Sequence, residues 1–207
     1  MSTVVRSLNE VYTMLRKAAI GAGCSHGIAE ELGRAGVWLC TAGQNGVGAV
    51  LSATQAANVR LNAPTIDGDG AVFHHGCAAT AGPAAMDLLL SKTDIRRVRI
   101  EDVDVPLLVA GLAGIRAAES NRAVLVEVDG AAKSLAACDF ERLKHATAIT
   151  FVLGTGQLSS GADTGVSAAE VDAAAWSDCE KLAARTYVPA TEQSRVRGAG
   201  ANITDND

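Results

Sequence analysis

The sequence predicts an α+β fold: an N-terminal helical hairpin plus a third helix, a small central mixed sheet with flanking helices, and a C-terminal helix followed by a polar tail. Three observations predict it. Apolar residues recur at helical spacing in the first part of the chain, short runs rich in β-forming residues fill the middle, and the end is polar. The 207 residues suit one compact domain, made of a helical part (1–60), an α+β part (61–184) and the tail (185–207).

The first helix is predicted to begin at a capping box. Ser7 and Glu10 have the spacing at which each side chain bonds the backbone N–H of the other residue. Apolar residues then follow at helical spacing: Leu8, Val11, Leu15, Ala18 and Ala19. Gly21 and Gly23 end the helix, because glycine is favoured just beyond a helix C-terminus.

A second helix is expected from Ser25 to about Gly43. Serine is a favoured N-cap residue, and acidic residues follow near the positive end of the helix dipole. Its apolar face consists of Ile28, Leu32, Ala35, Trp38 and Leu39. A shorter third helix is expected from about Val47 to Ala57.

The middle of the chain is predicted to alternate between strands and helices. A run dense in turn residues from Asn62 precedes the first strand candidate, Ala71–His75. Pro83 suits the first turn of a helix that runs to Leu90. The remaining elements expected here are strands at 98–100, 123–128 and 148–153 and a helix at 107–118. The stretch 130–144 is ambiguous.

A second capping box predicts the start of the last helix. Ser167 and Glu170 have the required spacing, and the helix would run to about Ala184. We therefore expect residues 167–170 to form the first turn of a helix.

Composition and charge exclude several classes of protein. The net charge of −5 and the lack of a basic stripe interleaved with aromatic residues argue against a nucleic-acid partner. The cluster Arg96–Arg99 alternates like a strand with one solvated, charged face. No secretory signal is found, and the longest apolar stretch, 105–115, falls short of the ~20 residues that span a bilayer. The five cysteines are odd in number and never form a C-x-x-C pair, which fits free thiols in a cytoplasmic protein without a membrane partner.

Three short clusters resemble chemical sites, and each has a simpler structural interpretation. His75 and Cys77 would share one face of a strand, whereas His74 would point to the other, and no second Cys/His pair lies at finger spacing. In the segment 24–26 the central serine is better explained as a helix cap than as part of a nucleophile–base pair. The glycine-rich segment 154–161 matches no nucleotide-binding motif and favours a loop. We expect no metal and no cofactor.

The tail holds the groups best suited to bind a small anion. Three residues offer planar guanidinium donors to carboxylate or phosphate: Arg185, Arg195 and Arg197. Further candidate ligands are Ser194, Gly198, Gly200, Asp205 and Asn206, with the glycines allowing backbone amides to approach an anion. Glu192 and Tyr187 are candidates for catalytic proton transfer. The same composition is also typical of a disordered terminus.

The most specific pattern in the chain lies in the tail, with weaker matches at the helices. The tail pattern is Tyr187-Val-Pro189, Glu192, Ser194-Arg195, Gly198-Ala-Gly200 and Asp205-Asn-Asp207. The weaker matches are Ser7-Leu-Asn-Glu10, Ala22-Gly23 and Pro106-Leu107-Leu108. In these features the chain resembles a family of uncharacterised bacterial proteins of about this length. The resemblance implies no established activity, but it implies that the tail is part of the fold, as an ordered site or a docking segment.

A second similarity concerns the helices between Leu15 and Leu51. It is carried by the order Ala22-Gly23, Ala29-Glu30-Glu31, Gly43 and Gly46-Val47. These features are similar to the N-terminal helices of the malate/L-lactate dehydrogenase family that is unrelated to the Rossmann enzymes. In that family an Asp-Ser-His-Gly segment supplies the catalytic histidine. Here Gln44-Asn45-Gly46 stands at the matching place, so the similarity does not extend to that histidine.

Two functions remain open on the sequence alone. The density of charged groups beside a glycine turn favours an enzyme, or an enzyme subunit, that acts on a small anionic metabolite through the tail. The lack of a complete catalytic constellation favours a non-catalytic partner or assembly protein. Its tail would dock onto another protomer of a homo-oligomer or onto a different protein.

Overall fold

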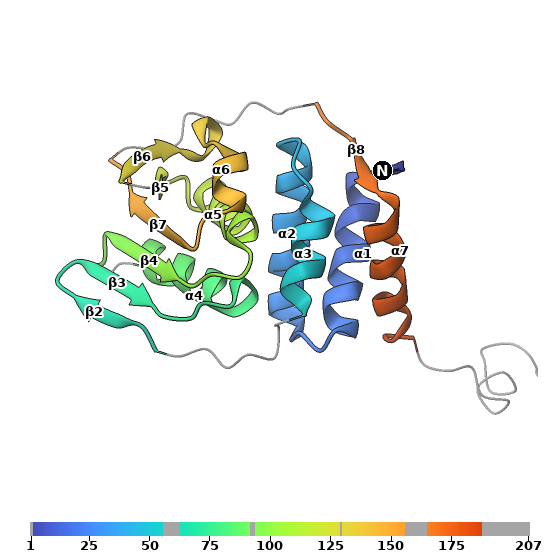
Figure 1. The fold of residues 1–207 in the computed structure, drawn as a ribbon, viewed down its shortest axis with the longest axis horizontal. Helices are drawn as coiled ribbons and strands as arrows, with labels where there is room; N and C mark the ends of the chain where they lie inside the picture. Colours follow the sequence, from blue (N-terminus) through green and yellow to red (C-terminus); the bar gives the residue numbers. More distant parts are fainter. Residues whose placement is uncertain (1, 56–62, 92–93, 129, 156–164, 188–207) are drawn as a thin grey trace, which may run out of the picture.

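The α+β architecture is confirmed by a computed structural model, which describes residues 2–55, 63–91, 94–128, 130–155 and 165–187. The elements lie in layers (Figure 1): a six-stranded sheet, then α4 and α5, then α2 and α3, and finally α1 and α7. A single apolar core runs through these layers. Among the described residues, no helix is both long enough and apolar enough to cross a membrane.

The three N-terminal helices are confirmed as α1 (Leu8–Gly21), α2 (His26–Thr41) and α3 (Gly46–Thr54). The apolar residues that predicted α1 form its buried face, namely Val11, Leu15, Ala18 and Ala19. A fourth helix, α7 (Ala173–Ala184), packs against α1 and α3 although it lies at the far end of the described chain. The helical layer is therefore completed by a segment distant in sequence.

The capping box at the start of α1 is also confirmed. Ser7 Oγ accepts from the Glu10 N–H at 3.2 Å, and the Ser7 N–H donates to Glu10 Oε2 at 2.9 Å. Hydrogen bonds to the Glu10 carboxylate from the Ser7 hydroxyl, at 2.7 Å, and then from the Ser7 N–H lower the pKa of Glu10. By contrast, Ser25 occupies the N-cap position of α2, but its side chain makes no cap hydrogen bond.

The two serines allow a matched test. Ser7→Ala should reduce the free energy of unfolding by about 1 kcal/mol, because the Glu10 N–H loses its acceptor and the Glu10 carboxylate loses the hydroxyl that donates to it. Ser25→Ala should cost clearly less, since no side-chain bond is lost. Urea unfolding monitored by circular dichroism measures both values, and equal losses would contradict the assignment of the cap to Ser7 alone.

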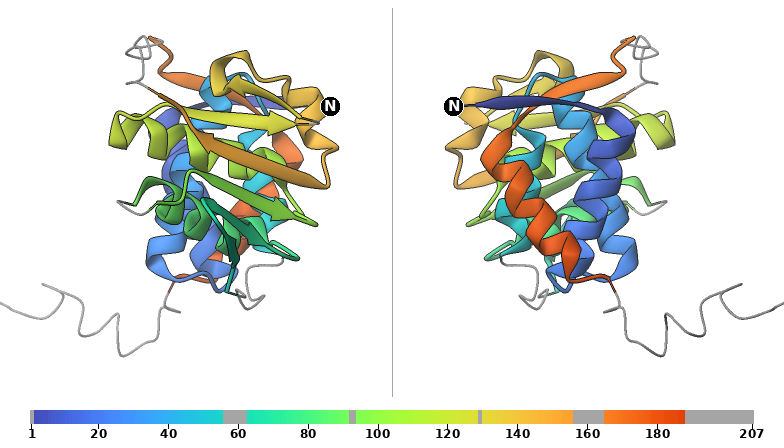
Figure 2. Two further views of the ribbon diagram at one scale, coloured as in Figure 1. Left: turned by 90° about the vertical axis from the view of Figure 1, so that its left-hand side faces the viewer. Right: turned by 90° about the vertical axis from the view of Figure 1, so that its right-hand side faces the viewer.

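A two-stranded antiparallel ribbon was not predicted. It pairs β1 (Thr3–Ser7) with β8 (Ala168–Asp172) and lies across one end of the helical layer (Figure 2). The prediction that Ser167 and Glu170 cap the last helix is wrong, because Glu170 lies within β8. The helix begins at Ala173 instead, where Asp172 Oδ1 accepts from the Ala175 N–H at 2.8 Å. Pairing with a strand more than 160 residues away overrides the local capping pattern.

The central sheet is mixed, as predicted, with strand order β2-β3-β4-β7-β5-β6. Its strands are β2 (Thr65–Asp67), β3 (Gly70–Phe73), β4 (Arg97–Glu101), β5 (Val124–Val128), β6 (Ala131–Ser134) and β7 (Ala148–Leu153). β3 and β4 are parallel, and β4 and β5 both run antiparallel to the β7 strand between them. The ambiguous stretch forms β6, a 3-10 turn (Leu135–Ala137) and the short helix α6 (Phe140–Lys144).

The two faces of the sheet differ in character. Val98, Ile100 and Phe151 are buried on the face that packs against α4 (Ala78–Leu90) and α5 (Pro106–Ser120). The opposite face is turned to the viewer in the left panel of Figure 2. On it, Arg97 and Arg99 are exposed and pair with neighbouring glutamates at 2.9 Å. The prediction of one charged, solvated face for this strand is therefore confirmed.

Helix α4 begins earlier than predicted. It starts at Ala78, so Pro83 lies inside the helix and not in its first turn. The start is set by a tertiary contact, because Asp104 Oδ1 accepts from the Ala78 N–H at 2.7 Å. The sequence around Pro83 does not reveal this partner, which follows the next strand along the chain.

Candidate functional site

Only the first two of the predicted tail residues lie within the described part of the chain. Arg185 is the C-cap of α7. Tyr187 is 62% exposed, and its hydroxyl lies 3.4 Å from Lys17 Nζ, with that ammonium 5.3 Å from the ring centroid. The remaining candidates lie outside the described residues: Glu192, Ser194, Arg195, Arg197, Gly198, Gly200, Asp205 and Asn206.

An open depression of about 430 Å³ borders Arg185 and Lys181. It lies where α1, α3 and α7 end, as the lining residues Ala22, Gln55 and Arg185 are the C-caps of these helices. Helix C-termini carry partial negative charge, which basic side chains compensate. The local field at this depression therefore favours cations, and the two basic residues are explained by the helix ends alone.

The loops that follow β3 and β4 lie side by side and are joined by hydrogen bonds. The Gly76 N–H donates to the Glu101 carbonyl at 2.9 Å, and His74 Nδ1 lies 2.9 Å from Glu101 Oε2. His75 Nδ1 lies 2.9 Å from Asp102 Oδ2. Hydrogen bonds from Arg99 and then from His74 lower the pKa of Glu101.

Backbone strain is concentrated at the same two loops. His75 has φ 53° and Asp102 has φ 50°, both in the left-handed region that residues other than glycine seldom adopt. Such conformations cost about 1–3 kcal/mol each and persist only where the surroundings hold them. No group of three or more His, Cys, Asp or Glu in the described residues is placed to hold a metal ion.

A pocket of about 330 Å³ lies between the loop that follows β4, the start of α5 and helix α3, and we call it the Lys144 pocket. The residues used below line it: Asn45, Ser52, Asp104, Pro106, Leu107 and Lys144. It faces the first turns of α3 and α5, whose N-termini carry partial positive charge. One oxygen of the carboxylate at its edge is engaged elsewhere, since Asp104 Oδ1 accepts from the N–H groups of Ala78 and Val105 at 2.7 and 2.8 Å.

Lys144 supplies the one formal positive charge in the lining of this pocket. Its Nζ pairs with Glu141 Oε1 at 2.5 Å across a single helical turn, and Glu141 is well exposed. Exposed pairs of this kind contribute little to stability, so the ammonium can turn towards a ligand at small cost. No sequence motif marked Lys144, because its neighbours in the pocket come from elements far apart in the chain.

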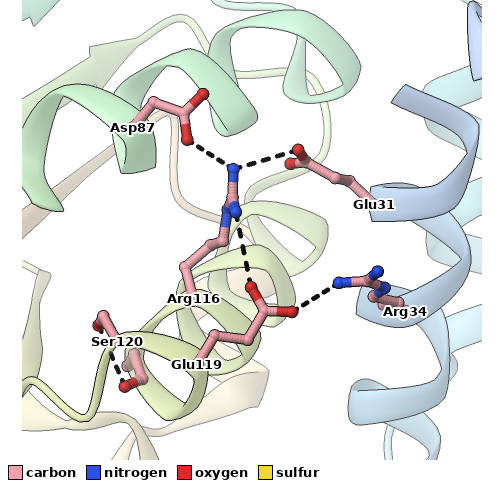
Figure 3. A network of polar contacts seen from close by, with 7 residues as sticks. Glu31, Arg34, Asp87, Arg116, Glu119 and Ser120 are labelled. Atoms are coloured by element: carbon pink, nitrogen blue, oxygen red, sulfur yellow. Dashed lines mark hydrogen bonds and ion pairs between the residues drawn. The ribbon is translucent and has the colours of Figure 1, made fainter. Parts of the chain in front are cut away.

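A second cluster of charged side chains joins α2, α4 and α5 (Figure 3), and we call it the Arg116 cluster. It consists of Glu31, Arg34, Asp87, Arg116 and Glu119. Arg116 Nη2 lies 3.2 Å from Glu31 Oε1 and 2.5 Å from Asp87 Oδ1, and Nη1 lies 3.5 Å from Glu119 Oε2. Arg34 Nη1 approaches the other oxygen of Glu119 at 2.5 Å.

Two atoms of the Arg116 cluster are fully buried and have no hydrogen-bond partner among the described residues. They are Glu31 Oε2 and Arg116 Nε. Leaving such a group unpaired costs about 1–3 kcal/mol, so an unpaired buried atom calls for an explanation. Burial raises the pKa of Glu31, while the charge of Arg116 lowers it and that of Asp87 raises it further. In the sequence, Glu31 is recognisable only as an acidic residue near the N-terminus of α2.

Comparisons with known proteins agree with the first resemblance seen in the sequence. The model of a family described as "Protein of unknown function (DUF3726)" matches residues 6–92, which include the capping box and Ala22-Gly23 but not the tail pattern. A search of curated proteins found no match. Among solved structures, malate dehydrogenase from Entamoeba histolytica is similar with a TM-score of 0.40 and 10% sequence identity, over 60% of this chain. The chain spans 38% of the length of that enzyme. The predicted resemblance to an uncharacterised family is thus confirmed over residues 6–92, which match the model of the DUF3726 proteins of unknown function.

Proposed function

We propose that the protein binds a small anionic metabolite, one that carries a carboxylate or a phosphate, in the Lys144 pocket. The observation that carries the proposal is the meeting of two helix N-termini and a lysine at one concave site. The partial positive charge of both helix ends and the full charge of Lys144 act on the same volume. The class of ligand is the one expected from the sequence, but the site differs from the predicted tail.

Each donor has a defined role in this proposal. Lys144 supplies the ion pair. The side chain of Asn45 accepts from the Gly48 N–H at 2.8 Å through Oδ1, which leaves its amide NH2 group to donate to the ligand. The Leu107 N–H belongs to the first turn of α5, where backbone N–H groups have no partner within the helix. Ser52 adds a hydroxyl at the rim.

The test is calorimetric titration with inorganic phosphate and with malonate. Lys144→Met keeps the aliphatic stem, removes the charge and should weaken binding about tenfold or more, because a charge-assisted hydrogen bond is lost. Lys181→Met is the matched control, since Lys181 also pairs with an acidic residue three positions earlier but borders the other depression. Equal binding by the wild type and Lys144→Met would refute the proposal.

The second candidate function is docking of the tail onto another protomer or another protein. It is favoured by Tyr187, a large side chain that stays 62% exposed beyond the end of α7. A chain that ends at Ala184 separates the candidates in the same experiments. If this truncation, and not Lys144→Met, abolishes anion binding, the ligand is held by the tail arginines. If the truncation lowers the mass in sedimentation and leaves anion binding intact, the tail is a docking segment. An unchanged mass argues against self-association through the tail.

Catalytic proton transfer by Glu192 or Tyr187 stays a prediction from the sequence.

A further inference from the structure

We propose that the cavity beside the Arg116 cluster binds a small molecule carrying both an ammonium group and a carboxylate, in the class of the aliphatic α-amino acids. The cavity has a volume of about 210 Å³ and lies between α2 and α5. It is separate from the Lys144 pocket, with which it shares no lining residue. The inference therefore does not depend on the anion site.

The first argument comes from the two buried atoms without partners. Glu31 Oε2 is an acceptor and Arg116 Nε is a donor, and their side chains are joined by the 3.2 Å ion pair. Both residues line the cavity. After a change of side-chain rotamer that turns both atoms towards the cavity, a ligand that presents a donor next to an acceptor would satisfy them at once. An ammonium group and a carboxylate on one carbon atom have this arrangement.

The second argument is the charge of the cluster. Three carboxylates, those of Glu31, Asp87 and Glu119, face two guanidiniums, those of Arg34 and Arg116. The excess of negative charge is unfavourable in a partly buried site and is relieved by a cation. The guanidiniums nevertheless remain suited to a carboxylate. A ligand with both groups fits this balance better than a simple anion or a simple amine.

The third argument concerns the apolar part of the cavity. Leu112 and Ile115 line it on the α5 side, and they would contact an aliphatic side chain. On the α2 side, Gly27 lines the cavity and has no atom within 4 Å of the position that a Cβ would occupy. The space beside Gly27 leaves room for the ligand, and a larger residue there would fill it.

The experiment is calorimetric titration of the full chain with three related probes. L-valine carries both charged groups, isobutylamine lacks the carboxylate, and 3-methylbutanoate lacks the amine. We expect L-valine to bind, isobutylamine to bind at least about tenfold more weakly, and 3-methylbutanoate to give no heat. Glu31→Gln keeps the shape of the side chain and should weaken L-valine binding at least about tenfold.

Two substitutions at one position keep the test decisive if Glu31→Gln fails to fold. Gly27→Leu should fill the cavity and abolish L-valine binding, whereas Gly27→Ala should leave it within about twofold of the wild type. Lys144→Met should not change L-valine binding, because the two sites are separate. The proposal is overturned if the wild type gives no heat with L-valine, if 3-methylbutanoate binds equally well, or if Gly27→Leu binds like the wild type.

Discussion

Arg116→Met is expected to lower the free energy of unfolding by about 2–4 kcal/mol, because it leaves three carboxylates facing one another without their shared guanidinium. Breaking a fully buried ion pair from one side costs about 3–5 kcal/mol, and Arg116 is 28% exposed, so part of the cost is screened by solvent. Methionine keeps most of the apolar stem in place. Urea unfolding at neutral pH measures the loss.

The loss should also depend on pH. Burial raises the pKa of Glu31, so this carboxyl holds its proton more tightly in the folded state than in the unfolded chain. A group of this kind contributes stability below its ordinary value of 4.5, and the contribution is lost as the pH rises through the folded pKa. In the wild-type protein, the charge of Arg116 lowers the pKa of Glu31 in the folded state. Its removal should therefore cost little below pH 4.5 and more above it.

Arg34→Met is the matched control for this prediction. Arg34 pairs with Glu119 but not with Glu31 or Asp87, and its side chain is 49% exposed. An exposed pair contributes about 0–1 kcal/mol, so the control should lose far less stability. Equal losses for the two variants, or a loss at Arg116 that is the same at acid and neutral pH, would show that the cluster is not joined through Arg116.

The elements that could be predicted from the sequence are those whose signals lie within one segment. The capping box at Ser7 and the apolar spacing of α1 depend on residues a few positions apart, so the sequence alone reveals them. The ribbon of β1 and β8 could not be predicted, because each strand is short and is completed only by a distant partner. The start of α4 was misplaced for the same reason, since its cap comes from Asp104.

The candidate sites were harder to predict from the sequence than the helices and strands. Glu31 and Arg116 are 85 positions apart, and Asp87 lies on a third helix, so no local pattern joins them. The Lys144 pocket is assembled in the same way from α3, α5 and the end of α6. The sequence favoured the tail because its charged groups are close together along the chain, a criterion that does not detect sites made by tertiary packing.

The contact between α2 and α3 gives the second large expected effect. A Cβ at Gly46 would lie 2.0 Å from the carbonyl oxygen of Gly36 and 2.9 Å from Cys40 Sγ. The nearest atom belongs to the backbone of α2, which cannot turn aside as a side chain can, so the two helices would have to separate. Overpacking costs about 1–3 kcal/mol, and we expect Gly46→Ala to reach at least the upper end of this range in urea unfolding.

Two glycines of α2, Gly36 and Gly27, give the controls for Gly46→Ala. A Cβ at Gly36 would meet the side-chain atom Leu15 Cδ1 at 2.3 Å, which a change of rotamer can relieve in part, so Gly36→Ala should cost less. Gly27→Ala meets nothing within 4 Å and should stabilise the helix by up to about 1 kcal/mol. The same change from glycine to alanine should therefore lower the free energy of unfolding at Gly46 and raise it at Gly27.

Because Gly46 is the first residue of α3, its replacement should also displace Asn45 and weaken phosphate binding, whereas Gly27→Ala should not. If Gly46→Ala is destabilised but binds phosphate like the wild type, the α2–α3 contact does not position the anion site.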